Sequence, residues 1–343
     1  MLQANIKHLM LAAAIIIVSL SSCQTTAING DITIEHRKNL EQQMPLHTSQ
    51  PLHERSEQIP SSLLQAWTVA DSGLNPIAET YKAYLPTPAE KELLKQSFNT
   101  LPPQWKNILN HKLTRIFFVE NLIGAGITDW VINRETGEQF YTIMLNPRLF
   151  HTAAKTWLEY RANSMFSHGD YRITYANIPH VSALTYALLH ETAHIIDFEK
   201  RITPVVDPLI DQYKPINLTP TPFTQNIWQD YTQPTQNYDF PYRNKLNAYQ
   251  LSVKRGVIDN QKLPEIFASL TKRPFVSLYA CLSWAEDYAD FAAFHYLQTM
   301  VKALTLAIKK RKRDYCRYYT FKYFYQPKTV IKHPITLAQV VYR

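Results

Sequence analysis

Apolar side chains recur at helical spacing in four segments before residue 170. Residues three or four positions apart lie on one face of a helix, so each segment predicts a helix with one buried face. Proline near the start of two segments suits a first helical turn. The folded part is therefore expected to begin near Ser61, with predicted helices at 61–69, 88–98, 102–112 and 149–165.

Two shorter segments, 114–119 and 140–145, are rich in β-branched and aromatic residues, and Asn146-Pro147 ends the second. Residues of these types favour strands. Together with the four helices they predict an α+β fold that is mainly helical and contains a small sheet. At 343 residues the chain is long enough for a substantial core.

An apolar helix carrying two histidines and a glutamate is the most informative pattern. Residues 186–189 and 195–196 are apolar or aromatic, and between them lie His190, Glu191 and His194 in the order H-E-x-x-H. Residues four apart share a helix face, so the two histidines can bind one metal ion. Glu191 can then act as the general base on a metal-activated water.

The alternative interpretation is a helix whose histidines form ordinary hydrogen bonds in the core or point to solvent. A chain of this composition has roughly 0.02 expected chance matches to the motif. Unpaired polar groups are costly in a buried helix. Both considerations favour a metal site.

A catalytic zinc site needs a third protein ligand. Glu286 and Asp290 are four residues apart in a largely apolar segment, so Glu286 could bind the metal while Asp290 accepts the free N–H of a ligand histidine. A solvated acidic helix face is the alternative for this pair. Glu199 and Glu265 are the next candidates for the third ligand.

The segments 275–280 and 286–290, which read F-V-S-L-Y-A and E-D-Y-A-D, together with the H-E-x-x-H helix, resemble gluzincin metallopeptidases. The resemblance implies one Zn²⁺ per chain held by His190, His194 and Glu286. It further implies that Asp290 supports a zinc-binding histidine and that Tyr279 stabilises the oxyanion.

The same resemblance implies a zincin-like fold with a small sheet beside the H-E-x-x-H helix. In zincin-type peptidases the edge strand of that sheet pairs with extended substrate, and residues 140–145 are the best candidate for this strand. The resemblance covers a minority of the chain. Ninety-two positions (286 − 194) separate the two blocks, so the fold between them is not inherited.

Residues 1–22 resemble a bacterial lipoprotein signal peptide, with a positive flank, a short apolar stretch and Leu20-Ser21-Ser22 before Cys23. Lipidation of Cys23 would anchor the protein in the cell envelope, and by family resemblance the outer membrane is the expected location. An ordinary secretory signal is the alternative. Residues 23–60 are polar and lack a sustained period, which predicts a flexible tether.

The domain predicted at 61–343 contains two unusual segments. Residues 201–267 are rich in proline. They are expected to form either an insertion that covers the cleft or an ordered surface loop with no functional role. Residues 309–343 are basic and aromatic, which indicates either a solvated face or a surface for anionic lipid or lipopolysaccharide rather than for nucleic acid. Cys281 and Cys316 could form a disulfide in an oxidising compartment.

The predicted function is a membrane-anchored zinc metallopeptidase that hydrolyses a peptide or protein substrate. One alternative is a zinc-dependent hydrolase acting on the peptides of peptidoglycan, which would use the same chemistry. The other is a non-catalytic envelope-binding lipoprotein that keeps the zincin scaffold. The presence of Glu191 weakly disfavours the last alternative, because an active site that has lost its function usually loses its general base first.

Overall fold

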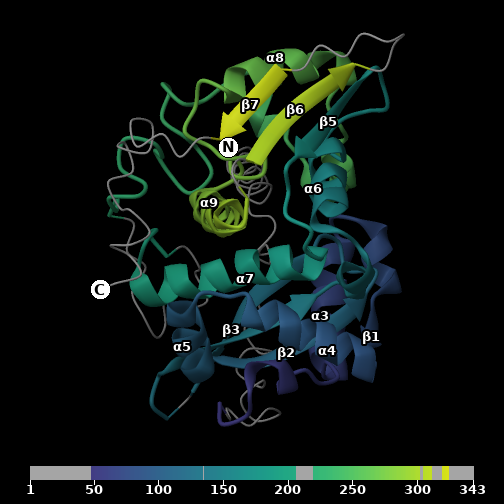
Figure 1. Cartoon of the computed structure of the whole chain (residues 1–343), viewed down its shortest axis with the longest axis vertical. Coiled ribbons are helices and arrows are strands. Elements are labelled where there is room, and N and C mark those ends of the chain that lie inside the picture. Colours follow the sequence, from purple (N-terminus) through teal and green to yellow (C-terminus); the bar gives the residue numbers. More distant parts are fainter. Residues whose placement is uncertain (1–47, 134, 206–218, 302–303, 311–318, 324–343) are drawn as a thin grey trace, which may run out of the picture.

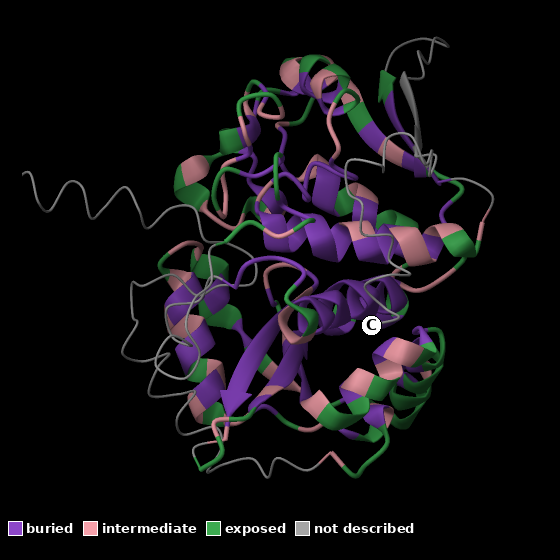
Figure 2. Ribbon diagram, turned by 90° about the vertical axis from the view of Figure 1, so that its left-hand side faces the viewer, coloured by how far each residue is buried: buried purple, intermediate pink, exposed green. Residues whose placement is uncertain are grey.

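A long buried helix, α7 (Ala183–Lys200), crosses the middle of the molecule and packs against α9 (Trp284–Thr299) (Figure 1). The computed structural model describes residues 48–133, 135–205, 219–301, 304–310 and 319–323. Almost every residue of α7 is buried, as Figure 2 shows, and most of α9 is buried too. These two helices therefore form the centre of the core, which is where their polar side chains need partners.

A four-stranded sheet lies below α7 in the view of Figure 1. Its spatial order is β1-β2-β4-β3, with β2 and β4 parallel and the outer pairs antiparallel. Its strands are β1 (Lys82–Tyr84), β2 (Leu113–Glu120), β3 (Gly126–Ile132) and β4 (Gln139–Leu145). The mixed sheet and the helices confirm the predicted α+β class.

The prediction that residues 140–145 form the edge strand is wrong. They belong to β4, which lies between β2 and β3 and is hydrogen-bonded on both sides. The continuous apolar run of β4 is typical of a strand buried on both faces. Among the described residues, β3 forms the edge of the sheet on this side.

Helices pack around this sheet at the predicted places. Three of them match the predicted helices closely: α3 (Ser61–Ser72), α4 (Pro88–Asn99) and α5 (Pro103–Lys112). A capping box between Thr87 and Glu90 fixes the start of α4. The helix predicted at 149–165 is shorter, because a 3₁₀ turn (Pro147–His151) precedes α6 (Ala154–Asn163).

The packed part of the chain begins before the predicted residue 61. A 3₁₀ turn at Leu52–Glu54 leads to Arg55, whose buried guanidinium donates to the carbonyls of Leu109 and Asn110. Ser56 then forms a β-bridge with Ile116. Residues 1–47, with the predicted signal peptide and Cys23, lie outside the described residues, and no described helix is long and apolar enough to cross a membrane.

A second, antiparallel sheet that was not predicted lies at the opposite end of the molecule (Figure 1). It consists of β5 (Tyr171–Ala176), β6 (Leu304–Lys310) and β7 (Tyr319–Tyr323). Only the first two residues of the predicted basic segment, Lys309 and Lys310, lie in β6. Residues 311–318, with Cys316, and residues 324–343 are outside the described part.

The proline-rich segment 201–267 is built mostly from turns where it is described. It contains four short 3₁₀ helices: η5 (Arg243–Lys245), η6 (Ala248–Gln250), η7 (Val253–Arg255) and η8 (Asn260–Lys262). The last leads directly into α8 (Leu263–Leu270), so the predicted insertion ends inside a helix. Residues 206–218 are not described.

Candidate metal centre

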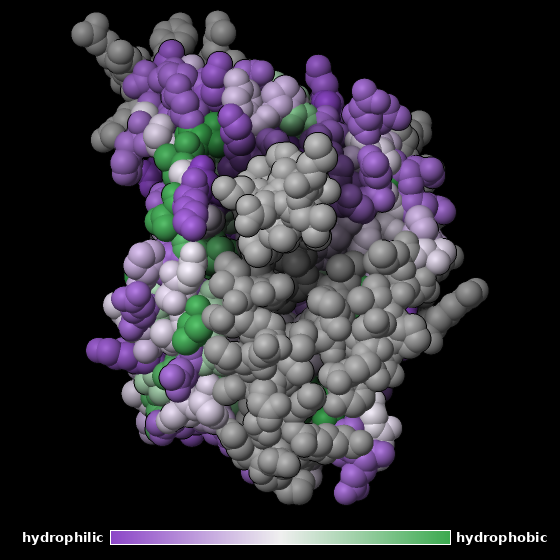
Figure 3. Space-filling view, turned by 180° about the vertical axis from the view of Figure 1, so that it is seen from behind, coloured by the Kyte–Doolittle hydropathy of each residue, from purple (hydrophilic) through white to green (hydrophobic). Residues whose placement is uncertain are grey.

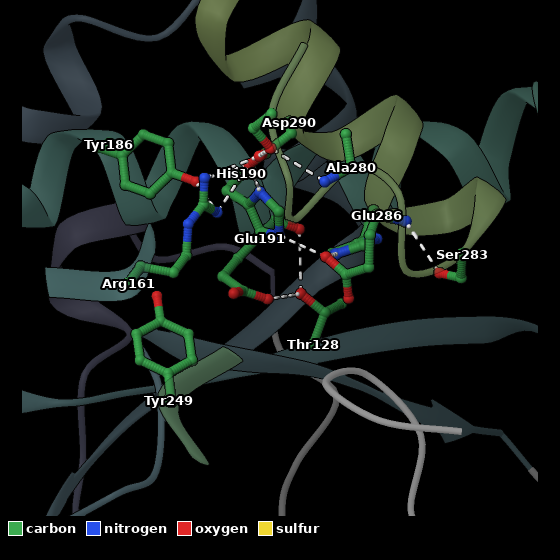
Figure 4. Close-up of polar contacts among 12 residues, drawn as sticks. Thr128, Arg161, Tyr186, His190, Glu191, Tyr249, Ala280, Ser283, Glu286 and Asp290 are labelled. Carbon is green, nitrogen blue, oxygen red and sulfur yellow. Dashed lines mark hydrogen bonds and ion pairs between the residues drawn. The ribbon is translucent and has the colours of Figure 1, made fainter. Parts of the chain in front are cut away.

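Three side chains that could hold a metal ion meet between α7 and α9. His190 and His194 lie one turn apart on α7, and Glu286 lies in the first turn of α9, where Ser283 caps the helix by accepting from the Glu286 amide. One ligand atom from each lies within 4.8 Å of the others. Glu286 Oε2 is 3.0 Å from His190 Nε2 and 3.8 Å from His194 Nε2 (Figure 4). The predicted ligand set is therefore brought together.

All three side chains are buried, and the surroundings of the two histidines shift their pKa values. Burial disfavours the imidazolium of His190, but hydrogen bonds with Asp290 and Glu286 outweigh this and raise its pKa to about 10. Burial lowers the pKa of His194 to about 4. Two carboxylates thus create a strongly negative potential at His190, which a divalent cation would neutralise.

Asp290 holds His190 in place, as predicted. Its carboxylate accepts from His190 Nδ1 at 3.0 Å, which directs Nε2 of the same ring toward Glu286. Tyr186 donates to the same carboxylate at 2.7 Å, Ser277 donates at 2.5 Å, and Arg161 donates through both terminal nitrogens. Donation of a hydrogen bond to a carboxylate fixes the tautomer and orientation of a metal-binding histidine.

Arg161 supplies the positive charge that keeps Asp290 ionised in a fully buried position. Burial alone would raise the pKa of Asp290, but Arg161 and then His190 lower it well below its usual range. The guanidinium is itself only 2% exposed and stacks over the Tyr279 ring at 4.3 Å. A buried charge pair of this kind is strongly destabilised when one partner is removed.

Asp290→Asn is expected to reduce the affinity for a divalent metal by roughly 10- to 100-fold, the usual cost of losing a hydrogen-bonding partner behind a ligand. The amide cannot serve as a charged acceptor for His190 and Arg161 together. Competition with a metallochromic chelator measures the affinity. Asp287→Asn is the matched control, because burial raises the pKa of Asp287 and its side chain accepts from Trp228 instead. Equal losses in both variants would contradict the role of Asp290.

Glu191 lies beside the cluster and faces the first sheet. Thr128 on β3 donates to Glu191 Oε2 at 2.8 Å and also to the Glu191 carbonyl (Figure 4). Burial raises the pKa of the carboxyl to about 7. A Cβ on Gly126 would lie 3.0 Å from Glu191 Cγ, so a glycine lets β3 approach the helix this closely. A carboxyl with a pKa near neutrality can exchange a proton.

A cavity of about 50 Å³ borders this cluster on the side of His190 and Glu191. His190, Glu191 and Tyr279 line it together with apolar residues of α3 and the start of β3. Tyr279 is 6% exposed, and its ring centre is 5.7 Å from that of His190. The cavity thus places Tyr279 beside the cluster, and its oxyanion role stays a prediction.

The proline-rich segment contributes a further wall of the cavity. The residues concerned are Leu246, Asn247, Ala248, Tyr249 and Leu251. Tyr249 has a φ of 57°, a left-handed conformation that strains a bulky residue. Its hydroxyl accepts from Trp157 Nε1 and points toward Arg161 in Figure 4. The segment thus forms one wall of the cavity, and whether it controls substrate access stays a prediction.

Several residues of the site were not predicted from the sequence: Thr128, Arg161, Tyr186, Tyr249 and Ser277. Tyr186 precedes His190 by four residues on the same helix, a spacing that could have identified it. Ser277 lies in the quoted F-V-S-L-Y-A segment. The two other candidates for a third ligand do not belong to this group of side chains. Glu199 accepts a hydrogen bond from Tyr141, and Glu265 is exposed on α8.

A scan against protein-family models finds no match to this chain, and searches of curated proteins and of solved structures find no similar protein. The function must therefore be inferred from the arrangement of the site itself.

Proposed function

We propose that the protein is a zinc-dependent metallopeptidase with a zincin-like fold. The observation that carries this proposal is the buried cluster of His190, His194 and Glu286 beside Glu191 and an open cavity. Ligand atoms about 2.0–2.2 Å from a tetrahedral zinc ion lie roughly 3.3–3.5 Å apart. The separations of 3.0 and 3.8 Å from Glu286 to the two histidines lie on either side of that value. Two imidazoles and one carboxylate are also a usual donor set for catalytic zinc.

When bound, zinc would lower the pKa of a coordinated water to near 7 and polarise the peptide carbonyl. Glu191 takes a proton from the attacking water and delivers it to the amine nitrogen as the peptide bond breaks. Thr128 holds one carboxylate oxygen of Glu191 by its hydroxyl. Asp290 and Arg161 keep the His190 ring oriented through these steps. The phenol of Tyr279 donates to the carbonyl oxygen as negative charge develops.

The edge strand β3 provides the place for an extended substrate to pair. Among the described strands it ends the sheet, and its Thr128 is bonded to Glu191. A peptide that adds a strand here would form main-chain hydrogen bonds while its scissile bond lies near the metal centre. This role replaces the one predicted for residues 140–145.

Metal analysis combined with digestion of a peptide library tests the proposal. Purified protein is expected to contain about one zinc per chain. It should cleave peptides, lose this activity on chelation and regain it when zinc is added. Absence of bound zinc would contradict the metal centre. Zinc binding without cleavage of any peptide would instead favour a non-catalytic scaffold.

Tyr279→Phe is expected to lower kcat by roughly 10²–10³-fold, the cost of removing one oxyanion donor, with zinc content and KM near wild type. The phenol is suited to this role because it is neutral at pH 7 and its hydrogen bond strengthens as the oxygen gains charge. Tyr242→Phe is the control, because this half-buried tyrosine does not line the cavity. A lower Tm with unchanged kcat would show that Tyr279 only packs in the core.

A further inference from the structure

A second, larger concavity adjoins the cavity at the metal centre. This outer groove has a volume of about 1360 Å³ and lies between α6, β5, the end of β6 and the proline-rich segment. Ile123, Gly124 and Tyr249 line both the outer groove and the inner cavity. The two therefore meet at these residues, so that a chain lying across them would reach from one into the other.

The side chains of the outer groove are predominantly cationic. Five exposed cations line it: Arg148, Lys155, Arg172, Lys309 and Lys310. Glu159 is the one acidic residue among its described lining residues; it accepts from the Thr174 hydroxyl and the Tyr175 amide and pairs with Lys155 at 3.9 Å, which leaves four cations in excess. In the view from behind, the described surface at the top of the molecule is mostly hydrophilic, and a band of hydrophobic residues runs down one side of the molecule (Figure 3).

Two of these cations face each other across the second sheet. Arg172 on β5 is the direct cross-strand partner of Lys309 on β6. Like charges in this position destabilise a sheet. Within the described part of the chain, no ion pair with a carboxylate is recorded for either of them. An anionic ligand in the groove would relieve this repulsion.

We propose that the outer groove binds acidic side chains of a polypeptide substrate whose scissile bond lies at the metal centre. The proposal rests on the proposed peptidase function and adds a substrate class to it: polypeptides with acidic residues on one side of the cleaved bond. A polypeptide fits better than a lipid surface for a geometric reason. The groove is concave and continuous with the inner cavity, whereas a membrane presents a broad, gently curved surface to a protein.

Binding of labelled peptides to the zinc-loaded Glu191→Gln variant tests the proposal without turnover. The peptides share an uncharged central sequence taken from the cleavage library and carry glutamates or lysines on either flank. Each exposed ion pair contributes up to about a fivefold gain in affinity. Fluorescence anisotropy at low salt should therefore show roughly 10-fold tighter binding for glutamates on one flank, and high salt should weaken this preference.

Arg172→Gln combined with Lys309→Gln should remove most of this preference. Lys91→Gln combined with Lys254→Gln is the matched control, because both lysines are exposed and neither lines the groove or the cavity. The control should keep the full preference for the acidic flank.

Two outcomes would overturn the proposal. One is equal affinity for the acidic and basic peptides. The other is a pair of groove substitutions that abolishes binding to phosphatidylglycerol vesicles while the peptide preference persists, which would assign the groove to a membrane surface. Hydrolysis reports on the metal centre and anisotropy reports on the groove, so a failure of the peptidase function and a failure of this proposal are distinguishable.

Discussion

Glu191→Gln is expected to keep its fold and its metal but to lose roughly 10²–10⁴-fold in kcat, the contribution of one general acid–base group. The glutamine amide has nearly the same shape and can still accept from Thr128 through its oxygen. It cannot take a proton from water at neutral pH. Glu191 lies outside the group of three candidate ligands, so metal content should be unaffected.

Glu199→Gln is the matched control for this variant. Glu199 lies on the same helix, near its end, and accepts a hydrogen bond from Tyr141 at 2.8 Å. It does not line the described cavity, so kcat should stay near wild type. Metal content, Tm and hydrolysis of the best library peptide should be measured for both variants. Full activity in Glu191→Gln would rule out the proposed mechanism.

The centre of the site could be predicted because its signals are local. The spacing of His190 and His194 alone predicts that they share a helix face, and the apolar residues around them indicate that this helix is buried. Glu286 and Asp290 repeat the same four-residue spacing on a second helix. That these two residues lie next to α7 was predicted from the need for a third ligand and from the family resemblance. Periodicity alone does not show which helices pack together.

The rest of the site depends on contacts between distant parts of the chain. Arg161 lies within a predicted helix. Its charge can be buried because it pairs with Asp290, which lies 129 residues further along the chain. Tyr249 reaches the cavity from a segment whose turns have no hydrophobic period.

The sheets show the same limit. β3 was missed because Asp129 and Gly126 weaken its strand pattern, and its edge position is the basis of the proposed pairing with substrate. β5 and β6 pair across a long stretch of sequence, which local patterns do not reveal. The order of the strands in the first sheet also depends on pairing between distant segments. For this reason residues 140–145 were wrongly predicted to form an edge strand.

Glu286→Ala is expected to lose most of the bound metal, and with it essentially all hydrolysis. The carboxylate is 1% exposed and supplies the one acidic ligand in the group of three, so its removal leaves two imidazoles without an anionic partner for the cation. The loss of affinity should exceed the roughly 10- to 100-fold expected for a partner behind the ligands such as Asp290. Ser283 still caps α9 through a backbone amide, so the helix itself should persist.

Metal content after dialysis against a weak chelator, with circular dichroism as the check on folding, measures the effect of Glu286→Ala. Glu265→Ala is the matched control, since Glu265 is an exposed glutamate in the first turn of α8 and belonged to the alternative candidates for the third ligand. It should retain wild-type zinc and activity. A folded Glu286→Ala protein with as much zinc as the wild type would show that the third ligand lies elsewhere, and the arrangement of α7 and α9 would then need a different chemical explanation.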